Sequence, residues 1–84
     1  MKWTNPVPVT EEVAIHPIVI IHLSALAFPN PFEFAMIADK LIDEAFDEVY
    51  SSKLSEEENE NRVCTRYYQK IWNLILEKGR DNNV

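Results

Sequence analysis

Residues 30–50 read NPFEFAMIADKLIDEAFDEVY and carry the clearest signal for the fold of this chain. Asn30 suits the N-cap of a helix, Pro31 its first position and Glu33 its third. From there apolar residues recur every three or four positions, and acidic residues take the opposite side. The apolar stripe comprises Phe34, Ile37, Ala38, Leu41, Ile42, Ala45 and Val49. This pattern predicts an amphipathic helix over residues 31–50.

A second long helix is predicted over residues 56–78. Ser55 and Glu58 form an S-x-x-E capping box, and Gly79 suits a left-handed C-cap followed by a frayed tail over 79–84. Its core face is expected to hold Val63, Cys64, Tyr67, Tyr68, Ile71, Leu74 and Ile75, and its water-facing side to hold Arg66, Gln69, Lys70, Asn73 and Glu77. Because the intervening turn is short, the two helices should form an antiparallel hairpin.

The segment before this hairpin is less decisive. Pro17 suits a first helical position, and the run that follows it predicts a helix over 17–28 that is apolar on every side. Such a helix is either buried all round or covered by a partner. Its β-branched residues also suit a strand, so residues 13–23 remain open between strand and helix. Residues 1–16 are expected to form an extended arm, in which Trp3 should dock on the rest of the chain. Within it Thr10 suits the cap of a short turn through Glu12, and Val13–Ile15 suit a brief strand, and this choice stays open.

These elements together predict an all-α fold, a small three-helix bundle with an extended N-terminal arm. The 84 residues leave room for a single domain, and the one glycine and the lack of Asn-Gly or Asp-Gly pairs argue against a β-rich fold. The 46% hydrophobic and 26% charged residues are ordinary values for a globular chain, which excludes general disorder.

Net charge and cysteine content restrict the classes of function. The formal charge is −6, and residues 33–60 hold ten Asp or Glu against two Lys. This balance argues against direct binding of nucleic acid or of an anionic membrane, because both require positive charge. One cysteine, Cys64, excludes an internal disulfide and favours a reducing compartment. The longest apolar stretch, residues 18–28, is too short to span a bilayer, so we expect a cytoplasmic protein.

No recognisable catalytic site is present in the sequence. His16 and His22 fall on different helical faces and belong to no metal-binding motif, so His22 is interpreted as a core or interface histidine. Cys64 falls on the core stripe, and Ser24 lacks a nucleophile-elbow context. We therefore expect that the chain is not an enzyme and that it needs no cofactor, metal or catalytic residue.

Two acidic clusters admit a different hypothesis. Glu56-Glu57-x-x-Glu60 and, upstream, Glu44-x-x-Asp47 resemble the metal-binding helices of all-α nucleotide pyrophosphohydrolases. In that family E-E-x-x-E comes first and E-x-x-D follows on a later helix, whereas the order here is reversed. The resemblance implies a small Mg-dependent nucleotide hydrolase as an alternative function. Acids in the first turn of a helix also complement its dipole without any ligand.

The leading hypothesis is a protein-binding module, regulatory or inhibitory, that acts through an acidic helix face with apolar anchors. Like charges four residues apart cost helix stability, so their repetition favours a partner with a basic surface, although a solvated face explains it too. Size and charge suit a phage or mobile-element accessory protein, and a DNA mimic is a further form of the hypothesis. Mimicry would need the acids of residues 56–60 as well, or a dimer, because carboxylates about 6 Å apart are sparser than phosphates. The partner-binding residues are expected to be Asp39, Asp43, Glu44, Asp47 and Glu48, with Met36 and Tyr50 as anchors.

Self-association is the other alternative, in which the chain is a structural or assembly subunit. Three short helices cannot bury all the apolar surface of the first helix together with Trp3, Met36, Tyr50, Trp72 and Leu76, and exposed patches of that kind usually mark interfaces. We therefore expect a homodimer or a larger assembly, with Ile20 and Leu23 at the contact.

Overall fold

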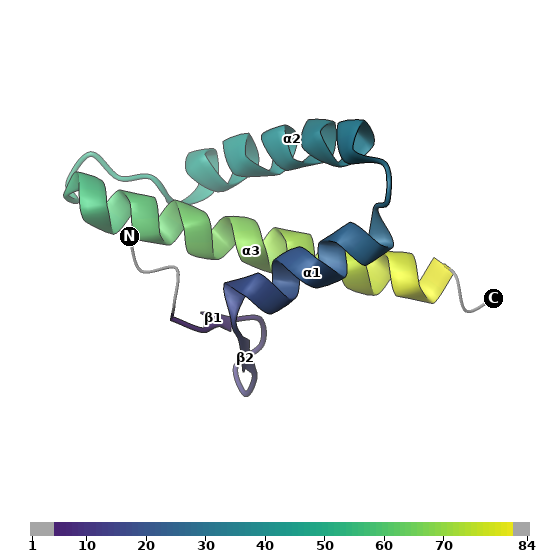
Figure 1. Ribbon diagram of the computed structural model, residues 1–84. Helices are drawn as coiled ribbons and strands as arrows, with labels where there is room; N and C mark the ends of the chain where they lie inside the picture. Colours follow the sequence, from purple (N-terminus) through teal and green to yellow (C-terminus); the bar gives the residue numbers. More distant parts are fainter. Residues whose placement is uncertain (1–4, 82–84) are drawn as a thin grey trace.

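The computed structural model describes residues 5–81 and contains three helices and two very short strands. The helices are α1 (Pro17–Ala27), α2 (Pro31–Val49) and α3 (Glu56–Asp81), as Figure 1 shows. Strands β1 (Val7–Pro8) and β2 (Ala14–Ile15) pair antiparallel, with Val7 opposite Ile15. The predicted small three-helix fold is therefore confirmed. None of the helices within residues 5–81 is long and apolar enough to cross a membrane.

At the start of each helix a polar side chain accepts hydrogen bonds from backbone amides of the first turn. Asn30 Oδ1 accepts from the amides of Phe32 and Glu33, at 3.0 and 3.2 Å. Ser55 Oγ accepts from the Glu58 amide at 3.2 Å, as its capping-box position predicts. At the start of α1, His16 Nδ1 accepts from the Ile18 amide at 3.1 Å. The open alternative for residues 13–23 is thus resolved as a strand that ends at Ile15 and a helix from Pro17.

The end of α3 differs from the prediction. The helix continues through Gly79 to Asp81, and Gly79 does not take a positive φ, so the expected left-handed cap is wrong. Lys78 and Arg80 lie in the last turn, where cations complement the helix dipole. Lys78 Nζ also lies 5.4 Å from the centroid of the Phe28 ring, which contacts Phe34 in turn. This contact ties the α1–α2 connection to α3 at the position where the helix was expected to stop.

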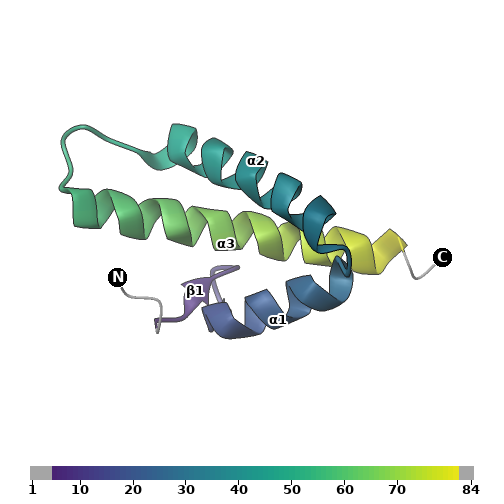
Figure 2. The ribbon, with the colours of Figure 1, turned by 45° about the horizontal axis from the view of Figure 1, so that its top comes forward.

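Helix α3 is the central element of the fold. Figures 1 and 2 show α2 running antiparallel along one side of it and α1 lying along another side. Both α1 and α2 make their main contacts with α3. The core cluster joins Val7 of β1, Ile20 of α1, and Tyr68 and Ile71 of α3. The molecule is correspondingly flat, with extents of 45 × 29 × 19 Å.

The N-terminal arm, expected to be extended, forms a small hairpin that contains both open alternatives, a turn capped by Thr10 and a strand over Ala14–Ile15. Thr10 Oγ1 accepts from the amides of Glu12 and Val13 and closes its turn. Gln69 Nε2 donates to the Pro8 carbonyl at 2.6 Å, which fastens β1 to α3 and corrects the expectation that Gln69 faces water. The predicted docking of Trp3 and the end of the predicted tail, residues 82–84, lie outside the described residues.

Candidate functional site

The five acidic residues predicted to bind a partner do not form one solvated face. Glu48 pairs with two cations of α3, Arg66 at 3.1 Å and Lys70 at 2.6 Å, and Glu44 lies 3.6 Å from Lys70. The side chain of Lys70 is only 16% exposed, so the expectation that Lys70 faces water is wrong. Sequence analysis missed these cross-helix pairs because they depend on how α2 and α3 are rotated against each other.

The pairing changes the electrostatics of this side of α2. Hydrogen bonds from Lys70 and then Arg66 lower the pKa of Glu48 from its ordinary value, so its carboxylate is held in the charged form. Two cations and two carboxylates therefore offset each other here. Glu44 and Glu48 stabilise the contact between α2 and α3 and leave little uncompensated negative charge for a partner.

The three aspartates of α2 remain as the uncompensated acids. Asp39, Asp43 and Asp47 are exposed, and within residues 5–81 none of them makes an ion pair. Asp39 lies close enough to Tyr67 of α3 to help raise the pKa of that phenol, although burial is the larger cause. Because Asp39 lies towards Tyr67 and Glu48 towards Lys70, the acidic residues occupy both flanks and the outer side of α2.

Large apolar side chains lie among these aspartates. Met36 is 76% exposed and Tyr50 is 49% exposed, as expected for anchors on the outer side of α2. The Tyr50 ring stacks on Phe46 with centroids 4.6 Å apart, and Phe46 is itself about half exposed. Phe46 was not singled out from the sequence, although its i, i+4 spacing to Tyr50 already placed the two rings on one side of a helix.

A groove opens between α2 and the N-terminal half of α3, with a volume of about 530 Å³. Its walls and floor are mainly apolar, and two glutamates lie at its edge. We call this surface the apolar groove; it is lined by Ile42, Phe46, Tyr50, Leu54, Glu56, Asn59, Glu60, Val63 and Cys64. No Lys or Arg is among these residues. The groove therefore combines apolar contact area with negatively charged side chains.

Asn59 holds the loop that closes one end of this groove. Its side-chain oxygen accepts from the Ser51 amide at 2.9 Å, and its nitrogen donates to the carbonyls of Ser51 and Leu54 at 2.8 and 3.4 Å. The residue is buried, with 7% of its surface exposed. Asn59 thereby fixes the position of Leu54 and of the chain that follows Tyr50.

Neither of the two possible nucleophiles, Cys64 and Ser24, lies in an activating environment. Cys64 is half-buried in the groove, where burial and then the charge of Glu60 raise the pKa of its thiol, the opposite of what activation requires. Ser24 is buried and donates to the Ile21 carbonyl at 2.7 Å. His22 is exposed on α1, so it is not a core histidine, and its alternative place at an interface stays a prediction; His16 caps α1.

The residues behind the hydrolase hypothesis lie on different parts of the surface. Glu44 faces Lys70, whereas Glu56 and Glu60 line the apolar groove. Within residues 5–81, no group of three or more His, Cys, Asp or Glu side chains is placed to hold a metal ion.

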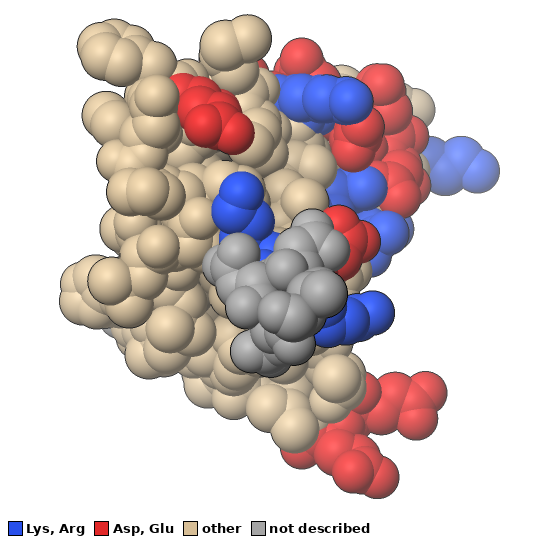
Figure 3. All heavy atoms as spheres, turned by 90° about the vertical axis from the view of Figure 1, so that its right-hand side faces the viewer, with Lys and Arg blue, Asp and Glu red and all other residues tan. Residues whose placement is uncertain are grey.

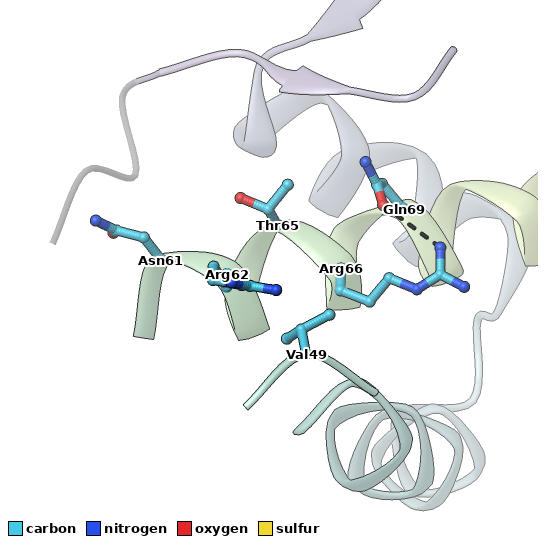
Figure 4. Close-up of a pocket in the computed structure, with 6 residues that line it drawn as sticks. All are labelled: Val49, Asn61, Arg62, Thr65, Arg66 and Gln69. Atoms are coloured by element: carbon cyan, nitrogen blue, oxygen red, sulfur yellow. Dashed lines mark hydrogen bonds between the residues drawn. The ribbon is translucent and has the colours of Figure 1, made fainter. Parts of the chain in front are cut away.

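A second, shallower hollow of about 300 Å³ lies against another side of α3 (Figure 4). Its lining residues are Val49, Asn61, Arg62, Thr65, Arg66 and Gln69. Arg66 could serve an anion there, but its guanidinium already binds Glu48 and lies 3.5 Å from Gln69 Oε1, the contact drawn in Figure 4. The guanidinium of Arg66 is therefore already engaged by a carboxylate of α2.

The outer face of α1 is apolar and exposed. Only Pro17, Ile20 and Ser24 of this helix are buried, whereas Ile18, Val19, Ile21 and Leu26 are exposed, which corrects the interpretation of a helix buried all round. Figure 3 shows charged side chains gathered on one half of the molecule and a broad, almost uncharged area on the other, the side on which α1 lies. Ile20 is 0% exposed and belongs to the core, so it is not available to a second copy; Leu23 is half-buried.

Three comparisons with known proteins offer no relative from which a function could be transferred. No protein-family model, no curated protein and no solved structure matches this chain. The function is therefore argued from the surfaces described above.

Proposed function

We propose that this chain is a small protein-binding module that acts through the outer side of α2. The observation that carries the proposal is the mixture of uncompensated carboxylates and large exposed apolar side chains on one helix. Asp39, Asp43 and Asp47 supply the charge, and Met36 and Tyr50 supply apolar area. Interfaces need such apolar anchors, because charges alone contribute more to the rate of association than to affinity.

The partner expected on this surface is a protein with a basic patch. Three aspartates without an ion pair, on a chain of net charge −6, give a negative potential that attracts cations over about one Debye length. The binding would block or position a basic surface, which is the chemistry of a regulator or an inhibitor.

The first prediction is that the D43K/D47K variant loses its partner but keeps its fold. Both aspartates are exposed, and the substitution relieves like-charge repulsion along α2, so the free energy of unfolding should change by less than about 0.5 kcal/mol. Proteins of the source cells that are retained by the wild type and lost with D43K/D47K identify the partner. Its association rate with purified wild type should fall as salt rises.

The matched control is E11K/E12K, which makes the same change of charge at two exposed residues of the β1–β2 turn. This variant should retain the partner. Equal loss with both variants would show that only net charge matters. Retention of every captured protein by D43K/D47K, with unchanged salt dependence, would show that the acids serve solubility alone.

A second candidate function, self-association into an assembly, is favoured by the outer face of α1. No Asp, Glu, Lys or Arg occurs from Val13 to Phe32, so a second copy can cover this face without burying an unpaired charge. Leu26, 79% exposed, would lie at such a contact.

The second prediction tests this candidate by analytical ultracentrifugation over a series of concentrations. Wild type is expected to sediment as a dimer or larger species at high micromolar concentration, and Leu26→Glu as a monomer with unchanged helix content. Leu76→Glu, the same substitution at an exposed leucine of α3, is the control and should remain associated. A wild type that stays monomeric throughout would exclude the assembly function.

A further inference from the structure

The apolar groove is the uncovered continuation of the surface on which α1 packs. Glu60, Cys64 and Tyr68 lie four residues apart along α3 and so form one row on its surface. Tyr68 packs in the cluster that contains Ile20 of α1, whereas Cys64, one turn earlier, lines the groove. The same side of α3 is therefore covered at Tyr68 and open at Cys64.

The difference in helix length explains why the groove is open. The 11 residues of α1 extend about 16 Å, whereas the 26 residues of α3 extend about 39 Å. Figure 2 shows that α1 covers only part of α3, and that the N-terminal end of α3 extends past α1 beside the last turn of α2 and the α2–α3 connection. Over the first turns of α3 the third layer of the bundle is thus missing, and the groove opens there between α3, the end of α2 and the connection.

We infer that an amphipathic helix of a partner protein fills this missing layer, with its apolar side in the groove and basic residues facing Glu56 and Glu60. A helix suits the site because the groove is open and lies between two antiparallel helices, which is the geometry of helix-in-groove recognition. Phe46 and Val63 would contact residues spaced i, i+3 or i+4, and i+7 on that helix.

The acidic residues at the groove indicate that the bound helix is basic. Glu56 and Glu60 line the groove, and no Lys or Arg is among the lining residues. Asp43 and Asp47 follow directly after the groove residues Ile42 and Phe46 in α2. A second copy of this chain would bring a net charge of −6 against these acidic residues, whereas a basic helix is attracted to them. The inference rests on the proposed function, since it names the part of the basic partner that the module holds.

The test uses the single thiol of the chain as a reporter of groove occupancy. The probe is a synthetic helical peptide with leucines at i, i+4 and i+7 and lysines on both flanks. One control peptide has the same composition with the leucines distributed around the helix, and another has glutamates in place of the lysines. The measured quantity is the rate at which iodoacetamide alkylates Cys64 of the full chain at mildly alkaline pH.

The basic amphipathic peptide is expected to slow alkylation about tenfold at saturation, with a midpoint that rises with salt concentration. Phe46→Ala should weaken peptide binding about tenfold, whereas Phe32→Ala, the same substitution at an exposed residue of α2 outside the groove, should leave it unchanged. Circular dichroism establishes that Phe46→Ala is folded, and the thiol measurement on wild type does not depend on that variant.

Each other outcome overturns the inference. Peptide binding without protection of Cys64 would place the helix elsewhere. Equal protection by the peptide with distributed leucines would show that the apolar side is not needed, and equal protection by the glutamate peptide would show that basic charge is not needed. Protection that rises with protein concentration and needs no peptide assigns the groove to a second copy. If D43K/D47K loses the captured partner while the partner leaves Cys64 unprotected, the groove inference fails and the proposed function stands.

Discussion

Replacing Ile20 by alanine is expected to remove about 2–5 kcal/mol from the free energy of unfolding, because it leaves a cavity at the best-packed point of the chain. Ile20 is 0% exposed and joins Val7, Tyr68 and Ile71 in the core cluster. Domains are stable by roughly 0.05–0.15 kcal/mol per residue, so this loss is a large fraction of the total. Urea unfolding followed by circular dichroism measures it.

The control for this prediction is Ile18→Ala, on the same helix. Ile18 is 54% exposed, so the same loss of apolar volume should change the free energy of unfolding by less than about 0.5 kcal/mol at low protein concentration. Similar losses in the two variants would contradict the arrangement in which α1 buries one side against α3 and exposes the other.

Replacing Asn59 by alanine should produce the second largest loss, roughly 1–3 kcal/mol. The substitution removes three hydrogen bonds and leaves the amide and carbonyl of Ser51 without their side-chain partner. Asn59→Asp should not restore the stability, because its carboxylate can accept from the Ser51 amide but sets an oxygen in place of a donor against the Ser51 and Leu54 carbonyls and buries a charge.

Hydrogen exchange at the Ser51 amide gives a local measurement of the same clamp. Exchange is expected to quicken in both Asn59 variants more than at amides in the middle of α2. Asn73→Ala, at an exposed position of α3, is the control and should be neutral. An Asn59→Ala variant as stable as the wild type would show that the loop is held by other contacts.

The starts of the helices were predictable from the sequence because their causes are local. The Asn30 cap and the Ser55–Glu58 box act over three residues, and the apolar stripe of α2 repeats along the chain itself. The end of α3 was not predictable from the sequence. The helix continues through Gly79, which would suit a C-cap, and Lys78 contacts Phe28 from a distant part of the chain.

The site was predictable only in part, for a related reason. Exposure of Met36 and Tyr50 follows from their positions on the helical wheel of α2. The pairing of Glu48 with Arg66 and Lys70 depends on the rotation of two helices, and the apolar groove depends on α1 being shorter than α3. Neither the rotation of α2 against α3 nor the position of α1 along α3 can be read from the spacing of residues within one helix.

The central position of α3 also sets the order in which the chain can fold during synthesis. Ile20 leaves the ribosome long before Tyr68 and Ile71, the α3 residues with which it forms the core. Until then α1 has no surface on which to bury its apolar side, and Pro8 lacks the Gln69 side chain that fastens β1. Nascent chains paused before Tyr68 should therefore expose α1 to proteases and to chaperones that bind apolar segments, whereas longer chains should protect it.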